Sequence, residues 1–506
     1  MKWETDSSVL SHLGLLHNLV ENVVYQSKEK TDDLLQNGVM DYDHLWVLFA
    51  PGTDVVSRVE GGHYQAYRVS ETGQYCHERK PEEYRVECYY VDSSINGLGH
   101  CQHTFCVKRY GGLRPIRDLR PIPLEMHQDA HLREKLLARG RRFKQVNRLK
   151  YQSFSGTVRL LGENMQLNNA RVILDSASFE ACHALCDVFN TEAQEYKGRE
   201  LGPRGRERIW ERIRGLPDSE RILCAPTVRA FSLDFKATGD FAVDGLVDIE
   251  WDHKAFDRLV LHDGYKQLIL AFVEGQLVRT ENTFDDIIEG KGRGMAMLLQ
   301  GPTGVGKTLT AESVAETMSR PLYTMSAAEL GESANEIEDK FGAILRQCVK
   351  WEAVLLLDEC DVFLEKRSGA SIRQNRIVAV FLRLLEYYQG CLIMTSNRIK
   401  DFDPAFESRI DLTINYPPLD TDSRLQIWQN FLHASQQQHA DSERPERRIS
   451  EGDMEQLASV DLDGRQIKNI VKTATLLANK KDAILNIEHI IIVLRAKGII
   501  QRSGSG

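Results

Sequence analysis

Hydrophobic residues recur with different periods along this chain, and these periods predict where helices and strands lie. Between Leu10 and Leu35, apolar residues recur every three or four positions, which predicts a helix. A second helix is expected over 132–140, with Gly140 as its stop signal. Between these helices and after them the chain is rich in β-formers, and we expect strands at 64–69, 84–91, 104–110, 158–161 and 170–174. The first part of the chain therefore reads as an α+β domain.

The second half of the chain has a different pattern. Apolar residues from Ala255 to Val278 predict a helix, and three mainly apolar runs follow at 295–300, 354–357 and 391–395. Continuous apolar runs suit strands that are buried on both faces, as in a parallel sheet with helices on each side. We therefore expect an α/β domain with a parallel sheet, followed from about residue 420 by a small helical lid.

Composition narrows the class of protein. At about 150 residues per domain, 506 residues predict about three domains. With 64 Lys and Arg against 73 Asp and Glu, the net charge is −9, which argues against binding nucleic acid through bulk charge but allows a local basic groove. The chain shows neither a bilayer-spanning apolar run nor a signal peptide, and its ten cysteines form no C-x-x-C pair. We expect a soluble intracellular protein, in either the cytoplasm or the nucleus.

The strongest chemical signal lies between the strand 295–300 and a helix over 309–318. Glycines there fit the pattern G-x-x-x-x-G-K-[ST], in which backbone N–H groups and a helix start face phosphate oxygens. Lys307 can reach the β- and γ-phosphates, and the Thr308 hydroxyl can ligate Mg²⁺. The predicted phosphate site consists of Gly301, Pro302, Thr303, Gly304, Val305, Gly306, Lys307 and Thr308.

Polar residues follow the next two strands. Asp358 and Glu359 end the run 354–357, and Asn397 follows the run 391–395. Because ligands of parallel sheets bind at the carboxyl ends of the strands, Asp358 is expected to hold Mg²⁺ and Glu359 to polarise the attacking water. The Asn397 amide is placed to position that water or to touch the γ-phosphate.

In order and spacing, these motifs resemble those of the AAA+ ATPases. The resemblance runs from about Phe284 to Ile499, about two-fifths of the chain, and includes Asp403-Pro404-Ala405 with Arg409. The chain is most similar to AAA-type ATPases that are common in fungi and have a poorly characterised N-terminal domain. This closer similarity lies in residues 110–116, 139–143, 381–390 and 462–469.

The resemblance implies a P-loop core that binds ATP and Mg²⁺ and hydrolyses ATP. It implies that Asp358 is the metal aspartate, Glu359 the catalytic glutamate and Asn397 the first sensor. Arg409 would be a finger that reaches the nucleotide of a neighbouring subunit, so a homo-oligomeric ring is expected, with a hexamer as one ring size. Arg465 would be a second sensor that contacts the γ-phosphate from the lid.

The chain departs from the family pattern in two places. It has one arginine, in Glu407-Ser408-Arg409, where many AAA proteins have two, and this form resembles clamp-loader subunits. No aromatic residue stands between Tyr323 and Phe341, where protein-threading relatives carry a substrate-gripping loop. The resemblance therefore does not support threading by that grip.

The predicted organisation is a helical segment 1–40, an α+β N-terminal domain 41–200, a connector 201–280, an AAA+ core 281–419, a lid 420–500 and a flexible tail 501–506. The favoured function is ATP hydrolysis that remodels a protein partner recruited by the N-terminal domain. Two alternatives stay open. The missing aromatic favours an ATP-gated binding module with slow hydrolysis, and Ser408-Arg409 with the arginine-rich segment 199–214 favours a clamp-loader-like nucleic-acid factor.

Overall fold

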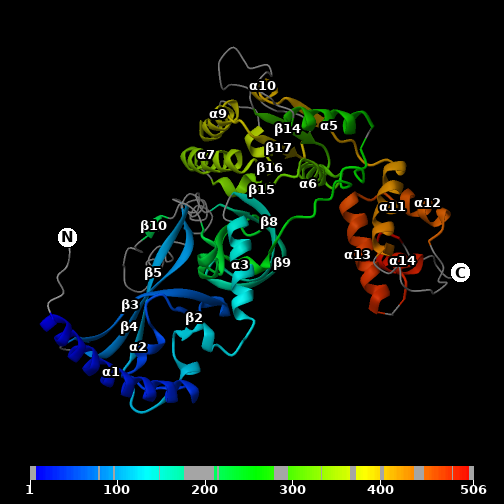
Figure 1. Cartoon of the computed structure of the whole chain (residues 1–506). Helices are drawn as coiled ribbons and strands as arrows, with labels where there is room; N and C mark the ends of the chain where they lie inside the picture. Colours follow the sequence, from blue (N-terminus) through cyan, green and yellow to red (C-terminus); the bar gives the residue numbers. More distant parts are fainter. Residues whose placement is uncertain are drawn as a thin grey trace. The chain divides into compact units, whose positions relative to one another are not determined.

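The chain divides into two compact units, Met1–Asp248 (unit 1) and Ile249–Gly506 (unit 2), each described by itself (Figure 1). The tail 501–506 and most of the arginine-rich segment, residues 199–209 and 213–214, lie outside the described residues. The computed structural model describes residues 7–77, 80–94, 97–146, 149–175, 210–212, 216–261, 263–277, 294–331, 333–364, 372–398, 404–437, 449–480 and 483–500.

In the described part of unit 1, two antiparallel sheets of five and six strands form the main framework. Alternating burial defines their faces: in β4 Tyr84, Val86 and Cys88 are buried, while the residues between them are partly exposed. One sheet has the order β10 (Trp210–Arg212), β5 (Gly97–Lys108), β4 (Lys80–Ser94), β3 (Tyr64–His77), β2 (Asp54–Arg58), β7 (Ile122–Pro123). The other has the order β12 (Ala237–Ala242), β11 (Thr227–Ser232), β9 (Glu163–Leu174), β8 (Lys150–Leu160), β13 (Leu246–Val247).

Two helices contribute to the core of the six-stranded sheet. They are the long helix α1 (Ser7–Gln36), through Leu34 near its end, and the short helix α2 (Leu45–Leu48). The strands β1 (Val39–Met40) and β6 (Arg114–Pro115) pair antiparallel beside them. Because buried apolar surface is the main source of folding free energy, this cluster holds the predicted N-terminal helix to the strands. The members of the cluster include Leu34, Met40, Leu45, Leu48, Phe49, Val55, Tyr67 and Val86.

The prediction that Gly140 ends a helix is wrong. Helix α3 spans Leu132–Val146, and Gly140 lies inside it. A Cβ atom at Gly140 would stand 1.9 Å from the carbonyl oxygen of Arg221, in the 3₁₀ turn Asp218–Leu223. The glycine therefore marks a close approach between the helix and this turn, which the local sequence pattern could not distinguish from a stop signal.

The unit boundary lies inside the segment 201–280, which the sequence analysis assigns to a connector. Strands β11, β12 and β13 of this segment belong to the five-stranded sheet of unit 1. Helix α5 (Asp263–Leu277) belongs to unit 2 and buries Ile269 and Val273 in its core. The two halves of the segment therefore pack into different cores.

Unit 2 contains a five-stranded parallel sheet. Four apolar residues of β16, Val354 to Leu357, are completely buried, as a central strand covered on both faces requires. The strand order is β15 (Leu322–Ser326), β16 (Val354–Asp358), β17 (Cys391–Ser396), β14 (Met295–Gln300), β18 (Leu412–Asn415).

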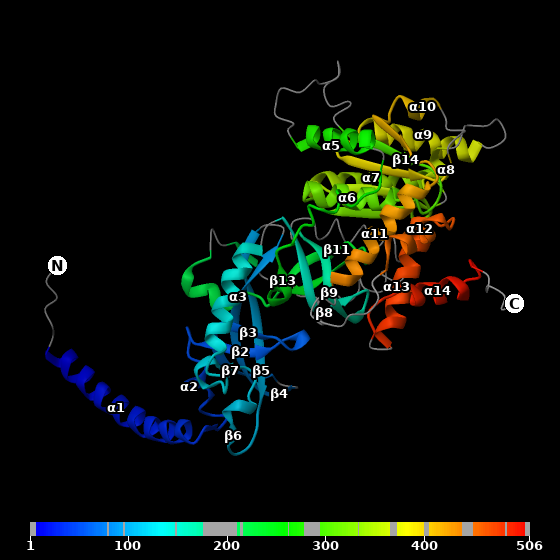
Figure 2. The same cartoon turned by 90° about the vertical axis from the view of Figure 1, so that its right-hand side faces the viewer.

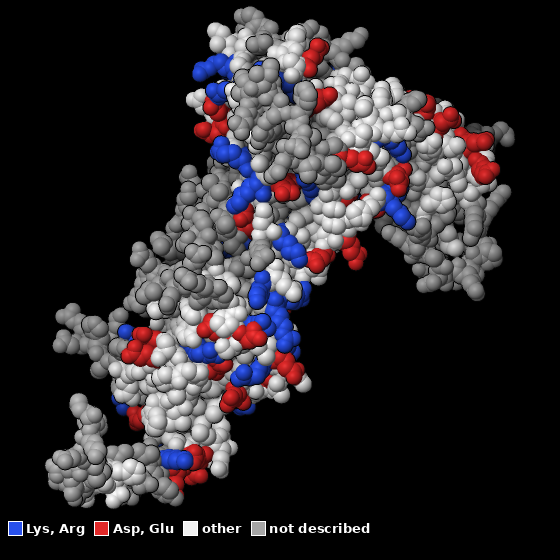
Figure 3. Space-filling view, turned by 45° about the horizontal axis from the view of Figure 1, so that its top comes forward, with Lys and Arg blue, Asp and Glu red and all other residues white. Residues whose placement is uncertain are grey.

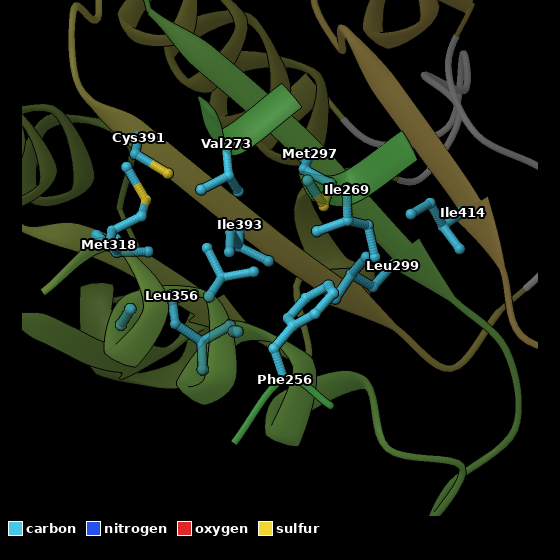
Figure 4. Close-up of a cluster of buried hydrophobic side chains, with 14 of the residues drawn as sticks. Phe256, Ile269, Val273, Met297, Leu299, Met318, Leu356, Cys391, Ile393 and Ile414 are labelled. Atoms are coloured by element: carbon cyan, nitrogen blue, oxygen red, sulfur yellow. The ribbon is translucent and has the colours of Figure 1, made fainter. Parts of the chain in front are cut away.

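Helices cover both faces of this sheet. Helices α5 and α6 (Lys307–Met318) form one layer, and α7 (Ala334–Trp351) and α9 (Ile372–Glu386) lie on the opposite side (Figure 1). The short helices α8 (Asp361–Leu364) and α10 (Pro404–Glu407) follow β16 and precede β18. On the α5 and α6 side, the close-up labels Phe256, Ile269, Val273, Met297, Leu299, Met318, Leu356, Cys391, Ile393 and Ile414 (Figure 4).

The chain ends in four helices that share a core around the buried Trp428 (Figure 2). They are α11 (Thr421–Gln437), α12 (Glu451–Ser459), α13 (Gly464–Lys480) and α14 (Ile487–Ala496). The predicted fold class is confirmed, because unit 2 has a parallel α/β core with C-terminal helices, and the N-terminal unit is separate and rich in β-structure. Within the described residues, no helix has the length and apolarity needed to cross a membrane.

The close approach at Gly140 gives a stability prediction. Gly140→Ala should destabilise unit 1 by about 1–3 kcal/mol, because the new methyl group forces α3 away from the Arg221 carbonyl. Hydrogen exchange of the full-length chain, read at α3 and at residues 218–223, measures this effect. Gly14→Ala in α1 is the control, since nothing lies within 4 Å of its Cβ position and alanine favours helix. Equal exchange at α3 in both variants would contradict the prediction.

Candidate functional site

The loop between β14 and α6 has the backbone form that the glycine pattern predicts. Gly304 and Gly306 have φ values of +74° and +103°, in the left-handed region that other residues avoid. Helix α6 begins directly afterwards, at Lys307. A loop of this kind lets backbone N–H groups converge at a helix start, where they attract anions.

The Lys307 ammonium lies within this loop. Its Nζ donates to the carbonyl oxygens of Gly301 (2.7 Å) and Pro302 (2.6 Å), and to Oδ1 of Asn397 (3.0 Å). The side chain is only 7% exposed. Burial lowers the pKa of Lys307, and the carboxylate of Asp358 opposes this effect. An anion in the loop would stabilise this buried positive charge further.

Two oxygen-bearing side chains meet beside the lysine. The Thr308 hydroxyl donates to Oδ1 of Asp358, with an oxygen–oxygen distance of 3.4 Å. Thr308 stands in the first turn of α6, and Asp358 is the last residue of β16. Hydroxyl and carboxylate oxygens are the ligands that Mg²⁺ prefers in proteins.

The hydroxyl of Thr395 contacts both acidic residues at the end of β16, one through its side chain and one through its backbone. It donates a hydrogen bond to Oδ1 of Asp358 and accepts one from the backbone N–H of Glu359 at 3.0 Å. Glu359 has a φ of +54°, which a non-glycine residue rarely adopts, and this hydrogen bond helps to hold it there. Thr395 is not among the predicted site residues, although a hydroxyl near the end of a buried strand is a usable signal.

The remaining predicted site residues lie on other elements. The exposed Arg465 is in the first turn of α13, and its positive charge adds to burial in lowering the pKa of Lys307. The same helix contacts the loop directly, because Gly464 N donates to the Gly304 carbonyl at 2.9 Å. Arg409 forms its contacts with a different set of residues: its guanidinium pairs with Glu386 at 3.1 Å. The structure therefore brings together Lys307, Thr308, Asp358, Glu359 and Asn397, with Arg465 within electrostatic reach.

Comparisons with protein families give two matches. Residues 297–418 match the model described as ATPase family associated with various cellular activities (AAA). Residues 30–128 match a domain of unknown function, DUF7025. The first match contains the phosphate loop and the ends of β16 and β17, and the second lies within unit 1.

Two curated relatives are similar to parts of the chain. One is the ATPase family AAA domain-containing protein FIGL1 of Arabidopsis thaliana, 28% identical over 207 residues, which are 38% of this chain and 28% of the relative. The other is the 26S proteasome regulatory subunit 8 homolog of Schizosaccharomyces pombe, 31% identical over 147 residues, which are 26% of this chain and 36% of the relative. The chain spans about a third of the length of these relatives.

The contact between the loop and α13 gives a second prediction. A Cβ atom at Gly304 would stand 2.5 Å from Cγ of Asp463, so Gly304→Ala should separate α13 from the loop and break the Gly464–Gly304 hydrogen bond. The amide of Gly464 should then exchange at least tenfold faster. Gly306→Ala is the matched control, because its φ is also positive but nothing lies within 4 Å of its Cβ position. Unchanged exchange in Gly304→Ala would show that the contact is not needed.

Proposed function

We propose, from the match of residues 297–418 to the AAA family model, that the chain is a Mg²⁺-dependent ATPase that works on a macromolecular partner as a ring oligomer. Two hydrogen bonds carry the proposal: Lys307 donates to Asn397, and Thr308 donates to Asp358. These contacts join the loop after β14 to the ends of the two neighbouring strands. One compact site thus holds the groups that ATP hydrolysis requires.

Phosphate binding is assigned to the loop Gly301–Thr308. Its backbone N–H groups and the start of α6 suit phosphate oxygens, and the buried Lys307 adds a full positive charge. A close approach of the residue that follows β18 supports this role, because a Cβ atom at Gly301 would stand 2.4 Å from the Tyr416 carbonyl. The start of the loop therefore has room only for glycine.

Metal binding is assigned to Thr308 and Asp358. Their oxygen atoms are close enough to share one cation, and both are hard ligands that fit Mg²⁺. When bound, Mg²⁺ neutralises charge that develops on the phosphates. Thr395 holds the Asp358 carboxylate in place through its own hydroxyl.

The hydrolytic step is assigned to Glu359 and Asn397. A carboxylate beside the γ-phosphate polarises the attacking water, and an amide orients that water or the phosphate. Glu359 is positioned by its hydrogen-bonded backbone, and Asn397 by its contact with Lys307. Arg465 contacts the γ-phosphate from α13, and Arg409 acts on the nucleotide of a neighbouring subunit.

Binding of the partner is assigned to unit 1. The predicted domain 41–200 includes most of the residues that match DUF7025. The absence of an aromatic residue between Tyr323 and Phe341 favours a second candidate, an ATP-gated binding module with slow hydrolysis. A nucleic-acid partner has less support. Acidic and basic side chains lie beside one another over much of the face in Figure 3, and residues 210–212 of the arginine-rich segment form strand β10.

Glu359→Gln tests the hydrolytic assignment. The variant should bind ATP as the wild type does, because phosphate and metal contacts remain, and its kcat should fall at least about 10²-fold. Steady-state phosphate release with Mg²⁺, and equilibrium nucleotide binding with fluorescent ATP, measure the two effects. Wild-type turnover no higher than that of Glu359→Gln, over a range of protein concentrations, would refute the ATPase proposal. Fast wild-type turnover would exclude the slow switch.

Mixing two inactive variants tests the action of Arg409 between subunits. Arg409→Ala should lower kcat about 10³-fold, because charge on the transferred phosphoryl group loses its partner. Added Glu359→Gln subunits keep an intact Arg409, so mixed oligomers should recover part of the activity at the sites of Arg409→Ala subunits. A titration of one variant into the other measures this recovery. If the mixture stays as inactive as its components, Arg409 does not act in trans.

A further inference from the structure

The guanidinium of Arg409 is engaged by its own chain. Its Nη2 donates to Oε2 of Glu386 at 3.1 Å, and its Nη1 donates to the Ala405 carbonyl at 3.0 Å. The Nε atom is buried and has no hydrogen-bond partner among the described residues. Both side chains of the ion pair are 28% exposed. Donors that would meet a phosphate are therefore already bonded to groups of the same chain.

Pairing with Glu386 and pairing with a phosphate compete for the same donors. A guanidinium binds carboxylate and phosphate through the same N–H groups, and the Glu386 carboxylate would repel a phosphate that approached while the pair was intact. Reaching a neighbouring subunit thus requires that Arg409 leave Glu386. The Arg409 side chain therefore has two states. In the retained state it is paired with Glu386, and in the reaching state it is released and can contact a neighbouring subunit.

The ion pair lies beside helices whose buried rings pack together up to the end of β16. Glu386 is the last residue of α9, and the buried Phe406 of α10 packs on Phe381 of α9 at a ring distance of 6.0 Å. Phe381 also stacks on Phe363 of α8 at 4.8 Å. Helix α8 begins three residues after Asp358. Buried rings of α8, α9 and α10 therefore pack together between the end of β16 and the segment that carries Arg409.

We propose that Glu386 is a positioning residue that retains Arg409 in its own subunit and thereby limits its action on the neighbouring nucleotide. The inference rests on the proposed function, in which Arg409 acts in trans. Partly exposed ion pairs are weak, so the pair favours the retained state but does not exclude the reaching state. Removing the carboxylate should accordingly raise the population of the reaching state by about two- to fivefold.

Glu386→Gln tests the proposal in the full-length chain. Its kcat at saturating ATP and Mg²⁺ should rise about two- to fivefold with KM unchanged, because the glutamine amide has a similar shape but no charge. Glu386→Ala should give the same direction. Glu338→Gln is the matched control. Glu338 pairs with Arg383 of helix α9, with Oε1 of Glu338 2.6 Å from Nη2 of Arg383. Loss of this ion pair should leave kcat unchanged. Thermal unfolding of each variant checks that it is folded.

The dependence on Arg409 separates retention from a general effect on the fold. In an Arg409→Ala background, Glu386→Gln should have no effect on kcat. A fall in kcat of Glu386→Gln would show that the carboxylate orients Arg409 for action, which overturns retention. The same rise with and without Arg409 would overturn it as well. Wild-type turnover no higher than that of Glu359→Gln would instead refute the ATPase itself.

Discussion

The site depends on the parallel pairing of β17 with a strand on each side. Its register aligns Ser396 with Gln300 of β14 and Met394 with Leu357 of β16, so the three strands end at the same edge of the sheet. That register places the loop that follows β14 within hydrogen-bond reach of the Asp358 carboxylate and of the Asn397 amide. Without this shared edge, residues separated by up to 90 positions would not form one site.

At this edge of the sheet, the buried hydroxyl of Thr395 positions groups of Asp358 and Glu359. Thr395 is 2% exposed, and its Oγ1 is bonded to both the Asp358 carboxylate and the Glu359 amide. A buried polar group left without a partner costs about 1–3 kcal/mol, so the three groups keep one another in place. The left-handed backbone of Glu359 is part of the same arrangement. One hydroxyl therefore fixes the carboxylate of the predicted metal ligand and the backbone of the predicted catalytic residue.

Glycine has two different uses in this chain. In the loop after β14, Gly304 supplies a left-handed backbone conformation and also leaves room for Asp463, the residue before α13. In α3, Gly140 only leaves room for the Arg221 carbonyl. The sequence pattern places Gly304 in a glycine-rich motif and Gly140 at a helix stop. Neither pattern shows which distant group approaches the glycine.

Local signals in the sequence were enough to predict the strands β14, β16 and β17 and the glycine-rich loop after β14, and to select Asp358, Glu359 and Asn397 as candidate site residues. A continuous apolar run that ends in polar residues already implies a buried strand with its functional end at the sheet edge. The sequence could not show that Thr395 joins the Asp358 carboxylate to the Glu359 backbone, that Glu386 pairs with Arg409, or that the halves of the segment 201–280 belong to different cores. Each of these depends on contacts between residues distant in sequence, and only the packing of the tertiary structure decides which distant groups meet.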